Sequence, residues 1–213
     1  MQRNEARFTD KAVLYQKFRP SYPQELVDYL YTRVGFTANS HIADIGSGTG
    51  IFSQLLLERG SRVYGVEPNK DMQQAAMQFL AGFLLFTAIT ASAEATALSK
   101  QSIDFITVSQ AFHWFDREAF KEECQRILNP DGQVVLIWNA RDYSHPVIQA
   151  EFALRQKYSD QESKEDPSKL EKDWTDFFDE GICEYKTCRN DLYLTREEYI
   201  GLTLSRSWAP NKK

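Results

Sequence analysis

Two rhythms of apolar and polar positions alternate along the chain from residue 41 onward. Short, nearly continuous apolar runs predict buried strands, whereas apolar side chains three or four positions apart predict helices. The expected strands share the first pattern and lie at HIADIG, RVYGVE, FLLFTAITA, IDFITVSQ and QVVLIWNA. The expected helices share the second and lie at IFSQLLLERG, NKDMQQAAMQFLAG and DREAFKEECQRILNPDG. Buried strands that alternate with helices indicate α/β architecture, with a doubly wound, mostly parallel sheet covered on both faces.

The first forty residues predict two helices before this sheet begins. The first runs from Phe8 to Lys17 and has only a weak apolar pattern. The prolines of FRPSYP, Pro20 and Pro23, then interrupt the helical pattern. Because proline is well tolerated in the first turn of a helix, Pro23 is expected to begin the second helix, QELVDYLYTRV.

The region after residue 139 has a different character. Residues 155–180 carry many charges of both signs. They predict either two solvent-exposed helices, with Trp174, Phe177 and Phe178 as a buried stripe, or an insertion that covers the open end of the sheet and shapes a substrate site. ICEYKTCRNDLYL then predicts a strand, and TREEYIGLTLSRSW predicts a final helix.

Composition narrows the classes of partner. The 213 residues are 42% hydrophobic, which is enough for one core. The formal net charge is −5 and the Lys and Arg residues form no long cluster, so nucleic acid is not expected as a partner. The three cysteines have no metal-type spacing and are expected to be reduced thiols, without a metal site. The N-terminus lacks the apolar core of a signal peptide and no apolar run reaches membrane-spanning length, so a cytoplasmic location is expected.

The glycines of IADIGSGTG are the strongest local signal. Gly46, Gly48 and Gly50 stand between an expected strand and an expected helix, where the backbone can turn tightly and approach a ligand closely. The free N–H groups at the start of the following helix favour a ligand at this edge of the sheet. A nicotinamide-dinucleotide fold is the weaker alternative, because the G-x-G-x-x-G fingerprint fails at Ile51 and because Asp44 would repel a pyrophosphate.

Glu67 is the second signal. It falls at the end of the second expected strand, in VYGVEPNKDM. An ionised carboxylate there can accept hydrogen bonds from both hydroxyls of a ribose. A glutamate at a strand end is otherwise an ordinary exposed charge, so this hypothesis depends on its pairing with the glycine loop.

Taken with these motifs, the sequence resembles a class I S-adenosylmethionine-dependent methyltransferase. The resemblance rests on IADIGSGTG, VEPNKDM, SAEA, SQAFHWFD and LNPDGQVVLIW, and on FRPSYP near the N-terminus. More narrowly, the motifs are similar to those of the small-molecule group that includes trans-aconitate methyltransferase-like proteins. The resemblance implies a Rossmann-like sheet, S-adenosyl-L-methionine as the cofactor and a small-molecule methyl acceptor.

The resemblance also implies which residues bind the cofactor. The glycine loop would face the methionine part, Glu67 the ribose, the residues around Pro68 and Ala93 the adenine, and the residues after the fourth strand the methyl-donor end. An N-terminal lid would close over the cofactor. The implied residues are Tyr15, Arg19, Asp44, Gly46, Ser47, Gly48, Glu67, Pro68, Met72, Ala93, Glu94, Gln110, Ala111 and Trp114.

The stretch SQAFHWFD is expected to form part of the methyl-donor end. The cofactor's sulfonium is a cation, and an aromatic face from Phe112 or Trp114 would stabilise it by about 0.5–2 kcal/mol. Asp116 is expected to cap the next helix. His113 is a candidate catalytic base, with a role in hydrogen-bonding the backbone or the substrate as the alternative.

The acceptor decides whether a base is needed. A carboxylic acid acceptor is already anionic, so it needs no base, and Arg19 or Arg141 could bind it. An amine or carbon acceptor would be helped by a base, which would favour His113.

We therefore expect a single methyltransferase domain over residues 1–213. It would comprise an N-terminal helical lid (1–40), a cofactor-binding core (41–139), and substrate-covering helices with a C-terminal strand and helix (140–213). Because relatives continue through a further strand, the sheet is expected to lack its last C-terminal strand. The expected function is methyl transfer from S-adenosyl-L-methionine to a small molecule. The alternative is a protein that binds S-adenosylmethionine or S-adenosylhomocysteine without transferase activity.

Overall fold

The computed structural model describes residues 12–158, 177–178 and 183–205. The chain divides into two compact units, one formed by Met1–Trp138 with Cys188–Lys213 and the other by Asn139–Thr187. The residues expected to bind the cofactor all lie in the first unit, which therefore carries the candidate site. The organisation of residues 1–213 as a single domain stays a prediction.

The first unit is built on a five-stranded sheet in which every neighbouring pair of strands is parallel, as the apolar runs predicted. The strand order is β3-β2-β1-β4-β5. The bounds are β1 (His41–Ile45), β2 (Arg62–Val66), β3 (Phe86–Ile89), β4 (Ile103–Ser109) and β5 (Leu128–Ile137). The order reverses between β1 and β4, and open α/β sheets bind ligands outside the carboxyl ends of the strands at such a reversal.

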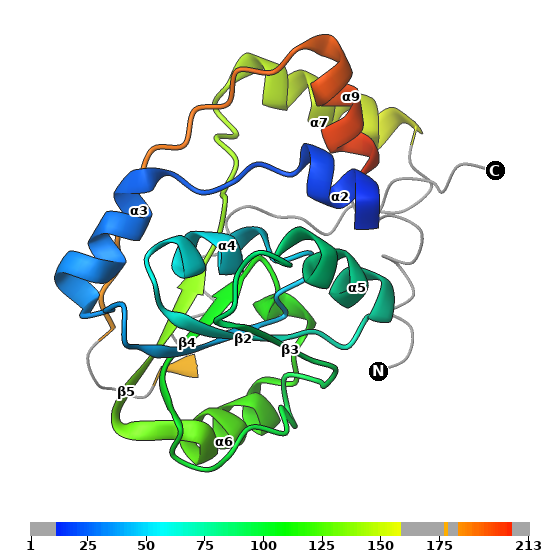
Figure 1. The fold of residues 1–213 in the computed structure, drawn as a ribbon. Coiled ribbons are helices and arrows are strands. Elements are labelled where there is room, and N and C mark those ends of the chain that lie inside the picture. Colours follow the sequence, from blue (N-terminus) through cyan, green and yellow to red (C-terminus); the bar gives the residue numbers. More distant parts are fainter. Residues whose placement is uncertain (1–11, 159–176, 179–182, 206–213) are drawn as a thin grey trace. The chain divides into compact units, whose positions relative to one another are not determined.

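Helices cover both faces of this sheet (Figure 1). Helices α4 (Ile51–Glu58) and α5 (Lys70–Phe79) lie on one face, and α6 (Arg117–Ile127) lies on the other. In α6 the buried side chains Phe120, Cys124 and Ile127 are four and three positions apart, which places them on one helical face toward the sheet. The core on the α4 side contains Leu30, Phe36, Ile42, Phe52, Leu56, Leu57, Val63, Leu80, Phe105 and Ile137.

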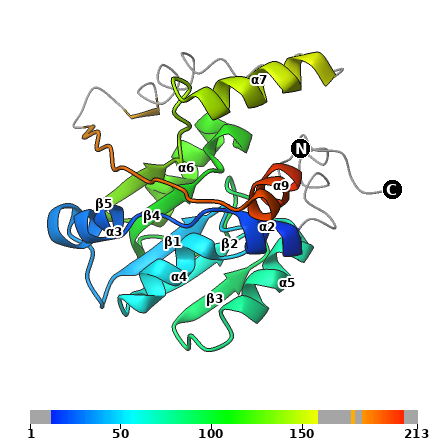
Figure 2. The same cartoon turned by 90° about the horizontal axis from the view of Figure 1, so that it is seen from above.

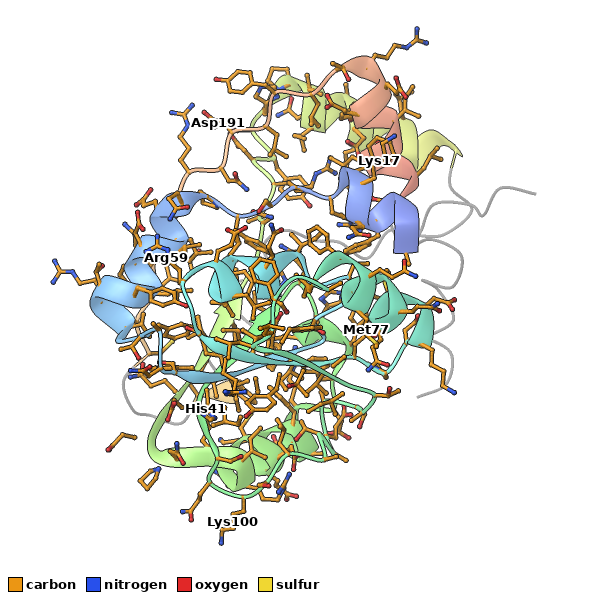
Figure 3. All side chains as sticks on the ribbon, in the orientation of Figure 1. Lys17, His41, Arg59, Met77, Lys100 and Asp191 are labelled. Atoms are coloured by element: carbon orange, nitrogen blue, oxygen red, sulfur yellow. The ribbon has the colours of Figure 1, made fainter. Side chains whose placement is uncertain are left out.

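The second predicted helix, α3, packs beside α4. It runs over Gln24–Tyr29 and continues as a π-helical turn over Leu30–Val34. The guanidinium of Arg59, at the end of α4, pairs with the carboxylate of Asp28 on α3 (Figure 3). Tyr31 donates its hydroxyl to the backbone oxygen of Leu56 at 3.2 Å. These two contacts join the segment after FRPSYP to α4, which covers one face of the sheet.

Two helices that are far apart in the sequence, α2 (Ala12–Phe18) and α9 (Arg196–Leu204), pack side by side (Figure 2). A Cβ placed on Gly201 would lie 2.5 Å from the ring of Phe18, so the missing side chain at this glycine makes room for Phe18. In addition, Asn190 Nδ2 donates to the backbone oxygen of Ser21 at 3.0 Å. The C-terminal part of the first unit thus holds the segment predicted to form the lid.

Three strand predictions need correction. Residues 183–194 are irregular and mostly exposed, so the strand predicted there is wrong. The backbone N–H and C=O groups of a strand need hydrogen-bond partners on a neighbouring strand. None of the described strands pairs with this segment. The third strand is shorter than FLLFTAITA. The fifth strand begins earlier than QVVLIWNA, because the residues NPDG, expected at the end of the preceding helix, lie inside β5. The register of β5 against β4 shifts between Ile103 and Phe105.

Other predictions are met only in part. The first helix covers Ala12–Phe18, and the remainder of the predicted helix lies outside the described residues. In the second unit, α7 covers Pro146–Tyr158, and Phe177 packs edge-on against Phe178 with ring centroids 5.3 Å apart. Trp174 lies outside the described residues, and both hypotheses for residues 155–180 stay predictions. The described residues contain five parallel strands and no antiparallel one in the sheet.

Candidate active site

The glycine loop crosses the carboxyl end of β2. Gly46, Gly48 and Gly50 have φ values of +69°, +56° and +83°, which lie in the left-handed region that favours glycine. The backbone N–H groups of Gly46 and Ser47 both donate to the carbonyl of Val66, at 2.8 and 3.2 Å. The sequence G-S-G-T-G therefore folds into a tight turn between β1 and α4, as predicted.

The three glycines have different neighbours. A Cβ on Gly46 would lie 2.5 Å from the Cβ of Ala111, and one on Gly50 would lie 2.7 Å from Leu80. A Cβ on Gly48 would meet nothing within 4 Å. The first and third glycines are thus required by protein packing, whereas the second leaves open space beside the backbone.

Glu67 lies at the end of β2 and contacts the loop directly. Its side chain is buried, and its two carboxylate oxygens accept the backbone N–H groups of Gly48 at 2.9 Å and of Asn69 at 2.8 Å. Asn69 in turn caps α5, because its side-chain oxygen accepts the N–H of Met72 at 3.0 Å. The structure therefore brings together two of the predicted residues, Glu67 and Gly48.

Asp44 is fully buried at the centre of the sheet, beneath the loop. Its carboxylate accepts hydrogen bonds from the hydroxyls of Ser53 at 2.6 Å and of Thr107 at 2.9 Å. Burial raises the pKa of Asp44 to about 6, although both hydroxyls act in the opposite direction. Asp44 therefore joins β1, α4 and β4, and its orientation of a cofactor ammonium stays a prediction.

Sequence reasoning missed Ser53 and Thr107. Both are fully buried polar residues, one on the inward face of α4 and the other within the apolar run of β4. A hydroxyl at a position that should be apolar was the signal, because buried polar groups need partners. The partner itself lies in a different element and could be identified only in the folded chain.

The predicted lid residues gather around Tyr22. The Tyr22 ring packs edge-on against Phe52 with centroids 5.1 Å apart. Burial raises the pKa of Tyr22 well above its ordinary value, and the neighbouring Tyr15 and Asp44 act in the same direction. The guanidinium of Arg19 lies over the ring of Tyr15, 4.6 Å from its centroid. The end of α2 and the segment FRPSYP thus place Tyr15, Arg19 and Tyr22 close together on the α4 side of β1.

Two hydrogen-bond donors near this point have no partner among the described residues. They are the buried Nε of Arg19 and Nε2 of Gln110. Gln110 also has a positive φ of +60°, which is rare for a residue with a side chain. Strained residues of this kind gather at functional sites. Just past β4, Gln110 therefore combines an unpaired side-chain donor with a strained backbone.

The stretch SQAFHWFD divides between core and surface. Phe112 has no exposed surface and packs against Phe115, Phe120 and Trp138. The guanidinium of Arg117 lies over the Phe112 ring, 5.4 Å from its centroid, so this ring already faces a cation of the protein, and its contact with the cofactor's sulfonium stays a prediction. His113 is exposed and its ring lies 4.6 Å from that of Trp114, which is half-buried.

Asp116 is the N-cap of α6, as predicted, because its side chain accepts the N–H of Ala119 at 3.2 Å. The adenine side of the predicted site is mostly enclosed by protein. Met72 and Ala93 are buried, and Pro68 is half-buried. Glu94 accepts the backbone N–H of Asp116 at 3.0 Å, so its carboxylate also serves the start of α6.

The described residues contain neither a metal-binding cluster nor a membrane-spanning helix. Within residues 12–158, 177–178 and 183–205, no cluster of three His, Cys, Asp or Glu side chains could hold a metal ion. In the same part of the chain, no helix is both long enough and apolar enough to cross a membrane.

The chain is similar to known methyltransferases. Residues 43–136 match the family described as methyltransferase domain. An uncharacterized methyltransferase of Mycobacterium tuberculosis (strain H37Rv) is 36% identical over 128 residues, which cover 60% of this chain and 50% of that protein. A solved structure from Anaeromyxobacter dehalogenans, assigned as a type II methyltransferase, has a TM-score of 0.52 at 28% identity and covers 66% of this chain and 57% of that one.

A second solved structure shares the fold over most of both chains. It comes from Methanococcus maripaludis and is assigned to the S-adenosyl-L-methionine-dependent methyltransferases. Its TM-score is 0.63 at 21% identity, and the match covers 88% of this chain and 89% of that one.

The chain has the Rossmann-like fold of class I methyltransferases, and residues 43–136 match the methyltransferase domain family. S-adenosylmethionine is the cofactor of that class. The chain spans about half the length of the curated relatives it matches first. Membership of the trans-aconitate methyltransferase-like group stays a prediction.

The residues at the loop fit such a cofactor. The open space beside Gly48 lets a ligand reach the backbone without meeting a side chain. Glu67 is held next to that space, and each oxygen of a carboxylate can accept more than one hydrogen bond. The buried hydroxyl of Thr49, in the same loop, has no hydrogen-bond partner among the described residues. These groups could hold the ribose and the methionine part of the cofactor.

Proposed function

We propose that this protein transfers a methyl group from S-adenosyl-L-methionine to a small-molecule acceptor, and that the acceptor is a carboxylic acid. The observation that carries the transferase part is the pairing of Glu67 with the N–H of Gly48 beside open space at the carboxyl end of β1. A buried, oriented carboxylate next to an exposed glycine backbone suits a ribose with an adjoining charged group.

The chain's own residues would bind and orient both reactants. Glu67 would accept hydrogen bonds from the ribose hydroxyls, while the turn at Gly46 and Gly48 keeps side chains away from the methionine part. When bound, the cofactor supplies a methyl group on a positively charged sulfur. Holding the acceptor in line with that methyl group can supply up to about 7–11 kcal/mol of the barrier. Tight positioning, rather than a reactive side chain, is therefore the main requirement of this site.

The donors near Tyr22 support an anionic acceptor. Arg19 and Gln110 each carry a buried donor atom without a partner among the described residues. A carboxylate accepts several such hydrogen bonds at once and gains from the positive charge of the guanidinium. It can take the methyl group on oxygen without losing a proton, so the reaction needs no general base. His113, which is exposed, then has the role of a wall or hydrogen-bonding residue rather than that of a base.

Arg19 is favoured over Arg141 as the residue that binds the acid. Arg141 belongs to the second unit, where its guanidinium pairs with the carboxylate of Glu151. That charge is already neutralised. Arg19 instead stacks on Tyr15, and its Nε is available to an acceptor.

The test is a pair of measurements on the same protein. Calorimetry with S-adenosylhomocysteine, and separately with a nicotinamide dinucleotide, identifies the cofactor, and only the former is expected to bind. A screen of carboxylic acids, amines and phenols with a labelled methyl donor then identifies the acceptor, and turnover is expected with acids. Arg19→Gln should remove turnover with acids while S-adenosylhomocysteine still binds.

Each contrary result has a distinct meaning. No binding of S-adenosylhomocysteine would refute the cofactor assignment. Binding without turnover in any acceptor class would favour a cofactor-binding protein that lacks transferase activity. Turnover with amines or phenols alone would refute the carboxylic acid and restore His113 as a candidate base.

A further inference from the structure

Helix α6 holds the loop that connects β3 to β4, residues 90–102. We call this segment the adenine-side loop, because Ala93 and Glu94 within it are the residues expected at the adenine edge. At its far end, the backbone N–H of Gln101 donates to the carbonyl of Arg126 at 3.0 Å. The loop therefore runs against α6, on the face of the sheet opposite to α4 and α5.

The middle of the adenine-side loop is bound by one buried side chain, Glu123. Its Oε1 accepts the backbone N–H of Thr96 at 2.7 Å and the hydroxyl of Thr96 at 2.5 Å. Thr96 is fully buried and Glu123 is almost so. The hydroxyl of Thr96 in turn accepts the N–H of Leu98 at 3.3 Å. A single carboxylate thus fixes the backbone two residues after Glu94.

Arg126 completes this arrangement from the next turn of α6. It donates to both oxygens of Glu123, at 2.7 and 2.8 Å, and to the backbone oxygen of Leu98 at 2.8 Å. Burial alone would raise the pKa of Glu123, but the hydrogen bonds from Arg126 and Thr96 outweigh it and keep that pKa below its usual value. The carboxylate is therefore ionised at neutral pH, and its bonds to the loop are charge-assisted.

The two ends of the segment around Ala93 are also anchored. On one side, Thr90 donates its hydroxyl to Gln73 on α5 at 2.6 Å. On the other side, Glu94 accepts the N–H of Asp116 at the start of α6. Between these anchors, a turn is closed by the N–H of Ala95 and the carbonyl of Ser92, 3.3 Å apart. The backbone around Ala93 and Glu94 is therefore held by three contacts, and the one from Thr96 to Glu123 is buried and charge-assisted.

We propose that Glu123 is a positioning residue for adenine recognition, because its bonds to Thr96 set the backbone of the adenine-side loop where the base edge would be read. This inference rests on the proposed cofactor. Glu123 has no role in methyl transfer itself, and its effect passes through Thr96. Loss of its bonds should therefore weaken discrimination between adenine and other bases more than it weakens affinity for the rest of the cofactor.

The test compares two ligands that differ only at the base, S-adenosylhomocysteine and S-inosylhomocysteine, whose 6-position carries oxygen instead of an amino group. The ratio of their dissociation constants measures adenine discrimination. Wild-type protein is expected to prefer the adenine ligand, and Glu123→Gln should reduce that preference on the order of tenfold. Affinity for S-inosylhomocysteine should change by less than about twofold, since its base makes fewer bonds that depend on the loop.

Two matched variants accompany this measurement. Glu122→Gln changes an exposed acid at the adjacent position of α6 and should leave the ratio unchanged. Thr96→Val removes the hydroxyl, with its bond to Glu123 and its weaker bond from the N–H of Leu98, but keeps the backbone bond to Glu123. It should reduce the ratio in the same direction if Glu123→Gln proves too unstable to purify. Far-UV circular dichroism and thermal unfolding confirm that each variant is folded.

The outcomes separate this inference from the proposed function. If wild-type protein binds neither ligand, the proposed cofactor is wrong and the inference falls with it. If wild-type protein binds S-adenosylhomocysteine and both variants keep the adenine preference, or lose affinity for both ligands equally, Glu123 is a structural residue only and the positioning role is refuted.

Discussion

The carboxylate of Glu67 accepts the backbone N–H of Gly48 at 2.9 Å, which joins the end of β2 to the glycine loop that follows β1. These two residues are nineteen positions apart in the sequence. The bond fixes the loop and, at the same time, places an acceptor beside the open space at Gly48. Glu67 therefore stabilises the loop, and the same side chain would bind the proposed ligand.

Glu67→Ala should weaken binding of S-adenosylhomocysteine by an order of magnitude or more. The substitution would remove two charge-assisted hydrogen bonds to the ribose, each worth about 1.5–3 kcal/mol, and would also release the N–H of Gly48. Calorimetric titration measures the change. Glu58→Ala, at an exposed position of α4, serves as the control and should bind normally. An unaltered affinity in Glu67→Ala would mean that the ribose is held elsewhere.

Alanine at Gly46 and at Gly48 should have opposite effects on folding and binding. Gly46→Ala would bring a Cβ to 2.5 Å from Ala111, so thermal unfolding should occur at a clearly lower temperature. Gly48→Ala has no such clash and should cost only about 1–2 kcal/mol for its left-handed backbone, yet its methyl group would fill the space offered to the ligand.

Differential scanning calorimetry and titration with S-adenosylhomocysteine check this contrast between the glycines. Gly48→Ala should remain folded and bind poorly, whereas Gly46→Ala should unfold early. Normal binding by a folded Gly48→Ala protein would show that the ligand does not occupy the space beside this residue.

Asp44 should make stability depend on pH between about 4 and 6. Its pKa is about 6 in the folded protein and near 3.8 in the unfolded chain, so in this range the folded state binds more protons. The free energy of unfolding therefore falls as pH rises through this range, and the effect levels off above about pH 6. Between pH 4.5 and 7 the fall due to Asp44 should be about 2 kcal/mol.

Urea denaturation of wild-type protein and Asp44→Asn at several pH values isolates this contribution. The difference in unfolding free energy between the two proteins should be larger at pH 4.5 than at pH 7, because asparagine does not titrate. A difference that stays constant across this range would mean that the carboxyl is not perturbed by its burial.

Gly201→Ala should separate α2 from α9 and thereby disturb the lid. The new methyl group would overlap the ring of Phe18, so this ring or one of the two helices must shift. We expect the Michaelis constant for the methyl donor to rise several-fold while the central sheet stays folded, because Tyr15 lies on the displaced segment. Steady-state kinetics and circular dichroism measure the two effects.

A second substitution shows whether the contact itself is responsible. Adding Phe18→Leu to Gly201→Ala provides room for the methyl group and should restore much of the affinity for the donor. Gly82→Ala is the control, since a Cβ there would meet nothing within 4 Å. Equal defects in the single and double variants would contradict a role for this contact.

The core of the fold could be predicted because its signals are local. Strands such as HIADI are mostly apolar and buried, and helices such as α6 carry buried residues at helical spacing and an aspartate at the cap. The strand predicted at residues 183–194 failed because a strand is stable only with a neighbour, and no local pattern reports whether a neighbour exists. The full burial of Phe112 could not be predicted for a related reason, since an aromatic residue after a strand can face either a ligand or the core.

Three features follow from the local sequence: the alternation of strands and helices, the left-handed glycines between β1 and α4, and the acidic residue at the end of β2. These features depend on backbone sterics and on apolar periodicity, which act over a few residues. The partners of the polar residues depend instead on the folded chain: Glu67 with Gly48, Asp44 with Ser53 and Thr107, and Glu123 with Thr96. Those pairs join elements that are distant in the sequence, so they exist only once packing has placed the elements side by side.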